Sequence, residues 1–341
     1  MPISSSLEPA PAHTQVSRDF IQNMPKVELH LHLGGSYPLS YLEEISTDHD
    51  RQCLHEYLCP KRDIISYHEW FRVFDVIERV VDSESKVEEG ARRLCHDLAK
   101  DGVIYVEIRT GLKDYGQGYV AYIDAVQRGI ERGIKETGIQ ARLILSFRRN
   151  TPFDLAKLTV EEAIARKDKG VVGIDVSGDS GIGNIEPLLP LLTKAKESGL
   201  GICIHMGECV EECDQKLILD HIIPHRIGHG VHLGDDAHKI VHENKLAVEA
   251  CLTSSVIAQM IAKEEHHPAI EWWKNGHPVC FSTDDPLIFQ VSLTDELWKL
   301  SQMENLDKKQ LVELSYDALN YSFLSKEEKE SLIHKIKNYY C

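Results

Sequence analysis

Lys26-Val-Glu-Leu-His-Leu-His-Leu33 is a short, largely apolar run that carries two histidines. Side chains two residues apart on a β-strand leave the same face, so we expect His30 and His32 to project together. A pair of satisfied histidines in the core would explain this run as well as a metal site would. The remainder of the chain favours the metal site.

Three further polar motifs each follow an apolar run, as expected at the C-terminal end of a buried strand. They are His205-Met-Gly-Glu208, Arg226-Ile-Gly-His-Gly230 and Ser282-Thr-Asp-Asp-Pro286. A catalytic zinc ion takes three or four protein ligands, commonly neutral imidazoles and carboxylates, and keeps an open position for water. The chain offers His30, His32, His205 and Asp284 as ligands, Glu208 and His229 as acid–base groups, and Asp285 as an orienting acceptor. A tight turn at 226–230 and an N-cap role for one of the two carboxylates are the structural alternatives.

Strand-like and helix-like segments alternate along nearly the whole chain. The expected strands are 27–33, 103–108, 142–147, 171–176, 201–205, 226–228, 247–251 and 279–282, and the expected helices are 119–135, 154–167, 185–198, 214–221, 237–243 and a helical tail over 293–340. This pattern predicts an α/β fold, a parallel (β/α)8 barrel of the TIM type. Active sites in such barrels lie at the C-terminal ends of the strands, where all the motifs fall. A doubly wound sheet would show a glycine-rich turn, which Gly34-Gly35 matches poorly.

About seventy residues separate the first two expected strands, far more than an ordinary βα loop contains. Within them, Trp70, Phe71, Phe74 and Ile77 recur at helical spacing. Core packing accounts for most of these side chains. An insertion after the first strand lies over the mouth of a barrel, so Trp70 and Phe74 are expected to form an apolar lid over a planar substrate.

The amino-acid composition limits which classes of partner and which cellular compartment we expect for the protein. The 341 residues carry a net charge of −16, which argues against nucleic acid and anionic membranes but not against a phosphorylated small molecule. Nine scattered cysteines without a Cys-x-x-Cys motif indicate free thiols and a reducing cytoplasm. No apolar run approaches a membrane span or a signal peptide. We expect a flexible leader at 1–17 and one catalytic domain over 18–341, and the sequence indicates no oligomeric state.

The ordered set His-x-His, Ser177-Gly-Asp179, His-x-Gly-Glu, Arg-Ile-Gly-His-Gly and Thr-Asp-Asp-Pro resembles the adenosine deaminase family of zinc hydrolases over about 24–297. The resemblance implies one zinc ion per subunit, held by His30, His32, His205 and Asp284. It also implies that Glu208 protonates the purine N1 and that His229 assists the metal-bound water. By the same resemblance, Asp285 accepts from N7 and the Gly178 N–H meets N3.

The implied reaction is a hydrolytic deamination at C6 of a purine nucleoside or nucleotide, with release of ammonia. Zinc lowers the pKa of bound water to about 7, which makes a nucleophile available at neutral pH. Protonation of N1 removes the negative charge that builds up in the ring, so Glu208 needs a raised pKa in the closed site. The leading substrates are adenosine and 2′-deoxyadenosine, which would give inosine and 2′-deoxyinosine in purine salvage.

The sugar side of the site departs from that pattern. The family carries an Asp, contacting the ribose 5′-hydroxyl, where this chain has Gly34, followed by Gly35 and Ser36. The N6-methyl-AMP deaminase branch has Asn-Gly-Ser there, and Arg148-Arg149 also resembles that branch. The alternative substrate is therefore a 5′- or N6-modified adenosine, such as N6-methyl-AMP or aminofutalosine, with Gly34, Ser36 and Arg148 at the 5′ group. A purine-binding protein without turnover is a further alternative.

Overall fold

The computed structural model describes residues 16–58, 67–210 and 213–340, and the side chains of 67–71 and 340 are not part of that description. The expected leader at 1–17 therefore falls almost entirely outside the described residues. Val16 is buried, and the Ser17 side chain accepts a hydrogen bond from the Phe20 N–H at the start of α1 (Arg18–Asn23). Within these ranges, no helix combines the length and the apolar character that crossing a membrane requires.

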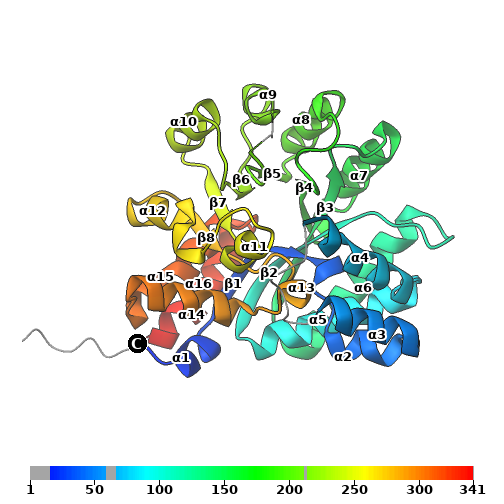
Figure 1. The fold of residues 1–341 in the computed structure, drawn as a ribbon, viewed down its shortest axis with the longest axis horizontal. Helices are drawn as coiled ribbons and strands as arrows, with labels where there is room; N and C mark the ends of the chain where they lie inside the picture. The colour runs from blue at the N-terminus through cyan, green and yellow to red at the C-terminus, as the bar shows by residue number, and fades with distance from the viewer. Residues whose placement is uncertain (1–15, 59–66, 211–212, 341) are drawn as a thin grey trace, which may run out of the picture.

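Eight parallel strands in sequence order form the centre of the described fold (Figure 1). They are β1 (Lys26–His32), β2 (Val103–Gly111), β3 (Gln140–Arg148), β4 (Val171–Ser177), β5 (Gly201–Met206), β6 (Arg226–His229), β7 (Ala247–Ala250) and β8 (Val279–Phe281). Helices between the strands surround this sheet, so the expected (β/α)8 barrel is confirmed. Every expected strand is present, and none is displaced.

The barrel closes between β8 and β1 through a short seam. Leu31 and Asp284 form an isolated parallel bridge, in which the His32 N–H donates to the Asp284 carbonyl at 2.9 Å and the Asp284 N–H donates to the His30 carbonyl at 2.9 Å. The buried Glu28 carboxylate adds bonds from the Thr283 N–H and hydroxyl, at 3.1 and 2.8 Å. The seam therefore places the ends of β1 and β8 side by side, together with the polar residues that they carry.

Helices follow the strands, and each expected helical segment is present, one of them with a shifted start. The expected tail over 293–340 forms three helices, and three short helices between residues 252 and 289 were not expected. They are α6 (Tyr119–Thr137), α7 (Phe153–Ala165), α8 (Leu189–Glu197), α9 (Gln215–His221), α10 (Asp235–Glu243), α11 (Leu252–Ile257), α12 (Pro268–Lys274) and α13 (Pro286–Phe289), then α14 (Leu293–Glu304), α15 (Lys308–Tyr321) and α16 (Lys326–Tyr340). The expected helix at 185–198 begins instead as a 3₁₀ turn over Glu186–Leu188, and α8 follows it. Pro190 lies in the first turn of α8, because proline has no N–H to continue an earlier helix.

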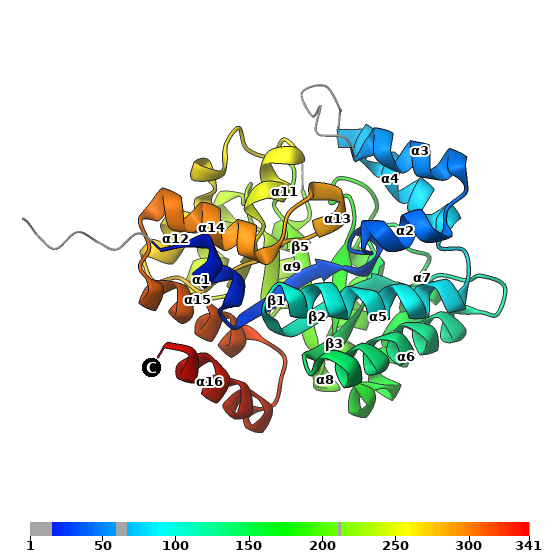
Figure 2. The same cartoon turned by 90° about the horizontal axis from the view of Figure 1, so that it is seen from below.

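The long insertion after β1 is helical, as expected. It contains α2 (Leu39–Ile45), α3 (Asp48–Tyr57), α4 (Tyr67–Val80) and α5 (Glu84–Lys100). Figure 2 shows α3 and α4 on one side of the barrel and α16 on the opposite side. The helix α5 packs closely on α6, where a Cβ on Gly129 would come within 2.2 Å of the Glu88 carbonyl oxygen. This packing anchors the insertion to the barrel wall.

The interior of the barrel is unusually charged. Such barrels are ordinarily filled by branched apolar side chains, but here Glu107, Arg109, Asp175, Arg226 and Glu249 are all buried. Buried charges are stable only when they are paired, and these five form a connected set of ion pairs. Above them, at the C-terminal ends of the strands, lie the candidate metal ligands.

Candidate active site

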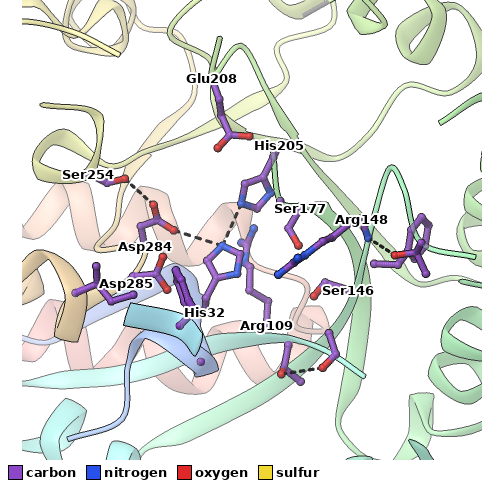
Figure 3. A pocket seen from close by; sticks show the side chains of 18 of the residues that line it. His32, Arg109, Ser146, Arg148, Ser177, His205, Glu208, Ser254, Asp284 and Asp285 are labelled. Atoms are coloured by element: carbon purple, nitrogen blue, oxygen red, sulfur yellow. Dashed lines mark hydrogen bonds and ion pairs between the residues drawn. The ribbon is translucent and has the colours of Figure 1, made fainter. Parts of the chain in front are cut away.

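The four proposed metal ligands come together at the C-terminal end of the barrel, and Figure 3 labels three of them, His32, His205 and Asp284. The strand β1 supplies His30 and His32, β5 supplies His205, and the segment after β8 supplies Asp284. One ligand atom from each lies within 4.8 Å of the others. The His32 Nε2 atom is 3.0 Å from His205 Nε2 and 3.3 Å from Asp284 Oδ1, and His30 Nε2 is 3.4 Å from Asp284 Oδ1. These separations suit tetrahedral ligands placed about 2.0–2.2 Å from one ion.

The electrostatics of these ligands also fit a cation. His30 Nε2 is fully buried and has no hydrogen-bond partner. Burial lowers the pKa of His32 and of His205, so both imidazoles are neutral and have a lone pair to donate. Burial and Arg109 lower the pKa of His30, but Asp284 and Glu249 outweigh them and raise it to about 9. A position that holds a proton this firmly also favours a metal cation.

Two buried carboxylates orient the histidine ligands from behind. Glu249 Oε2 is 2.6 Å from His30 Nδ1, and Asp175 Oδ1 is 3.1 Å from His205 Nδ1. Such contacts fix the tautomer and leave Nε2 for the metal. Arg109 joins the two carboxylates, donating to Glu249 Oε2 at 2.8 Å and to Asp175 Oδ1 at 3.3 Å. Although burial alone would raise the pKa of Asp175, its contacts with His205 and Arg109 hold that pKa below the ordinary value.

Two site residues adopt a left-handed backbone that L-residues rarely take. Asp284 has a φ of 66° and His229 a φ of 62°. Such conformations persist where the surroundings fix them, and they gather at functional sites. Asp284 is fixed by the β8–β1 seam and by the Ser254 hydroxyl, which donates to its Oδ2 atom at 2.6 Å.

The two candidate acid–base groups lie beside the ligand set. His229 Nε2 is 3.6 Å from Glu208 Oε1, and the His229 ring centre is 4.9 Å from that of His30. Burial lowers the pKa of His229 well below its ordinary value, so the imidazole is neutral and can accept a proton. Glu208 faces the same cavity from the segment after β5 (Figure 3).

A cavity of about 380 Å³ opens over this cluster, within the size range of small-molecule sites. Of the substrate-contact residues expected from the sequence, its lining includes Gly34, Phe74, Arg148, Gly178 and Asp285. The Arg148 side chain extends into the cavity between Ser146 and Ser177 (Figure 3). A Cβ on Gly178 would lie 2.9 Å from Arg148 Cγ, so the glycine makes room for this arginine. The expectation for the Trp70 side chain falls outside the described residues.

Some expected contacts have another role in the structure. Ser36 does not line the cavity, and its hydroxyl donates to the His32 carbonyl at 2.5 Å. Gly35 is covered rather than exposed, because a Cβ there would collide with the Asp285 carboxyl at 1.8 Å. Arg149 is buried away from the cavity and donates to Asp214 at 2.7 Å and to the His205 carbonyl at 3.0 Å. Only Arg148 of the arginine pair therefore lines the cavity.

Sequence reasoning missed the residues behind and around the site. It assigned no role to Arg109, Asp175 or Glu249, although a charged side chain inside an apolar strand is itself a signal that it has a buried partner. It also missed Glu78 and Lys113, which line the same cavity and form an ion pair of 2.8 Å. These contacts join segments far apart in the chain, so local patterns do not reveal them.

Comparison with known proteins agrees with this geometry. The family model for adenosine deaminase matches residues 25–339. An N6-methyl-AMP deaminase of Danio rerio is 32% identical over 330 residues, covering 92% of this chain and 94% of that protein. An adenosine deaminase of Clostridium perfringens is 28% identical over 324 residues, covering 91% and 97%. The crystal structure of arabidopsis ADAL complexed with IMP has a TM-score of 0.86 at 29% identity, covering 94% of this chain and 98% of that one. This chain belongs to the adenosine deaminase family.

Proposed function

We propose that the protein removes the 6-amino or 6-methylamino group of a purine nucleoside 5′-monophosphate by metal-dependent hydrolysis. The observation that carries the proposal is that Arg148 lines one cavity together with three of the metal-ligand residues, His32, His205 and Asp284. No ion-pair partner of Arg148 occurs among the described residues, so its guanidinium is available to a substrate anion. Arginine suits phosphate because its planar fork matches two phosphate oxygens.

The position of Gly34 supports a 5′-substituted substrate. Gly34 lines the cavity, and a Cβ built there would meet only Phe74 Cε1, at 4.0 Å. The space that an Asp would fill in the adenosine deaminase pattern is open and carries no negative charge. A 5′-phosphate is therefore not repelled at this point. The relative named N6-methyl-AMP deaminase and the relative bound to IMP agree with a monophosphate substrate.

The residues that would hold zinc are His30, His32, His205 and Asp284, because their donor atoms converge and His30 Nε2 is buried without a hydrogen bond. Bound there, the ion would act as a Lewis acid and would make water nucleophilic at neutral pH. His229, neutral and buried beside these ligands, would take the proton that the attacking water releases.

Glu208 and Asp285 would both hydrogen-bond to the purine base, and Glu208 would also activate it. As water adds to C6, Glu208 would give a proton to N1. The proton taken by His229 would then pass to the leaving amine, and the C6 hydroxyl would return a proton to Glu208 as the aromatic ring is restored. Burial and the charge of Asp284 raise the pKa of Asp285 well above its ordinary value, which favours the protonated carboxyl. Purine N7 has a lone pair, so a neutral Asp285 donates to N7 instead of accepting from it. The Gly178 N–H is the proposed donor to N3.

Deamination of adenosine or 2′-deoxyadenosine is the second candidate. The sequence motifs alone favour it, and the Clostridium perfringens relative is named adenosine deaminase. The groups proposed to read the base are common to both candidates, so only the 5′ side separates them.

A substrate panel tests the choice. Protein loaded with one equivalent of zinc is assayed for amine release from AMP, N6-methyl-AMP, adenosine and N6-methyladenosine. One charge-assisted hydrogen bond from Arg148 is worth about 1.5–3 kcal/mol, so we expect kcat/KM for the monophosphates to exceed that for the nucleosides by about 10- to 100-fold. Equal or faster turnover of the nucleosides would establish the second candidate. Tight binding without amine release would indicate a purine-binding protein.

A further inference from the structure

An ion pair bridges the rim of the cavity between the insertion and the barrel. Lys113 follows the end of β2 by two residues, and Glu78 lies on α4 one turn after Phe74. The Lys113 ammonium donates to Glu78 Oε1 at 2.8 Å. Both side chains line the cavity that Arg148, His32, His205 and Asp284 also line. The pair therefore ties α4 to the segment after β2 at the wall of this cavity.

Two cations of this cavity differ in their partners. Arg148 has no carboxylate partner among the residues that the structure describes, whereas Lys113 is held by Glu78. The side chains of Glu78 and Lys113 are 53% and 30% exposed, so water screens their attraction and the pair is weak. A dianionic phosphate attracts an ammonium more strongly than a single carboxylate does. An incoming phosphate can therefore replace Glu78 on Lys113.

We propose that Glu78 is a specificity-determining residue that occupies Lys113 until the 5′-phosphate of the substrate takes its place. This inference rests on the proposed function and extends it to a second phosphate-binding cation. With a monophosphate bound, Lys113 and Arg148 both contact the phosphate, and Glu78 is released to solvent. With a nucleoside bound, Glu78 keeps Lys113, and the original ion pair still ties α4 to the segment after β2.

The exchange is tested with Glu78→Gln, Lys113→Gln and the double variant, each assayed on N6-methyl-AMP and adenosine. The readout is the ratio of kcat/KM for the nucleotide to that for the nucleoside. Glu78→Gln is expected to raise this ratio about two- to five-fold, the equivalent of an exposed ion pair. Lys113→Gln is expected to lower it about 10- to 100-fold. The double variant is expected to match Lys113→Gln, because Glu78 acts only through Lys113.

A matched control exists on the same helix. Arg79 on α4 forms an exposed ion pair of 2.9 Å with Asp50 on α3, and neither residue lines the cavity. Arg79→Gln breaks an ion pair of similar length on α4 and is expected to leave the ratio unchanged. An equal effect of Arg79→Gln and Glu78→Gln would mean that the ratio follows the stability of α4, and it would overturn the inference.

Two further outcomes would also overturn it. If Glu78→Gln still raises the ratio in the Lys113→Gln background, Glu78 repels the phosphate directly and no exchange takes place. If Lys113→Gln lowers activity on both substrates equally, Lys113 has a structural role.

Calorimetric titration with IMP gives a readout independent of turnover, and the affinity for IMP should follow the same order among the variants. Wild-type turnover of N6-methyl-AMP decides the proposed function, whereas the variant ratios and IMP affinities decide the exchange.

Discussion

Glu208 and Asp284 both present carboxyl groups to the cavity, but their expected roles separate in experiment. Glu208→Gln removes the proton donor and leaves the four ligands intact, so zinc content should be unchanged and kcat should fall about 10²- to 10⁴-fold. Asp284→Ala removes a ligand, so zinc content and activity should fall together. Metal analysis of each purified variant, beside its kcat, checks both statements. Glu208→Gln with more than half of the wild-type kcat would mean that another group protonates N1.

Gly34 offers a second test at the scale of one residue. Gly34→Asp restores the carboxylate of the adenosine deaminase pattern in a space where a Cβ meets only Phe74. The new charge can accept a hydrogen bond from a free 5′-hydroxyl and repels a 5′-phosphate. We expect kcat/KM to rise for adenosine and to fall for AMP and N6-methyl-AMP. Gly34→Asn serves as an uncharged control of similar size, and an equal loss on nucleotides in both variants would contradict the electrostatic explanation.

At the scale of elements, Arg109 connects three strands behind the metal ligands. It lies on β2 and contacts Asp175 on β4 and Glu249 on β7. Arg109→Met should destabilise the fold by about 3–5 kcal/mol, because the buried Asp175 loses its arginine partner and the buried Glu249 loses one of two. Asp175 and Glu249 would then hold His205 and His30 less firmly. Zinc affinity, measured by chelator competition, should therefore fall by about 10- to 100-fold.

Arg226 is the matched control for this prediction. It is as buried as Arg109 and pairs with Glu249 Oε1 and with Glu107, but it does not contact Asp175 or the oxygen that holds His30. Arg226→Met should therefore lower stability by a similar amount and affect zinc affinity less. An equal loss of zinc affinity in both variants would show that general loosening of the barrel explains the effect.

The N-cap residue of α12 makes the stability of the fold depend on pH. The buried His267 accepts a hydrogen bond from the Ala269 N–H at 3.2 Å as the N-cap, and burial lowers its pKa to about 3. The unfolded state binds its proton near pH 6.5, so stability is lost as the pH falls below that value. Between pH 7 and pH 5 this histidine should account for about 2 kcal/mol. His267→Asn keeps a capping side chain without the titration, and urea unfolding of both proteins should show that difference.

Sequence reasoning located the elements well where apolar periodicity is strong. The strands of the barrel were predictable because each is a buried apolar run followed by polar residues. The short helices α11, α12 and α13 were not predicted, since four to seven residues contain too little periodicity to identify. The start of α8 was misplaced because Pro187 and Pro190 interrupt the helical spacing there.

At the scale of the whole molecule, the barrel determines which site residues could be predicted. The proposed metal ligands and acid–base groups lie at strand ends, where motif and topology agree, and the structure brings these residues together. The supporting carboxylates could not be found this way, because His30 and its partner Glu249 are 219 positions apart. The role of Ser36 was also not predictable, since only the folded backbone shows its hydroxyl bonded to the His32 carbonyl.

The proposed reaction is hydrolysis of the C6–N bond of a purine monophosphate at the metal-ligand cluster of this barrel. It is tested most directly by incubating the zinc-loaded protein with N6-methyl-AMP in ¹⁸O-labelled water and analysing the products by mass spectrometry. We predict methylamine and IMP that carries one ¹⁸O atom at C6 of the base and an unlabelled phosphate. N6-methyl-AMP that stays intact while adenosine is converted to labelled inosine would contradict the account.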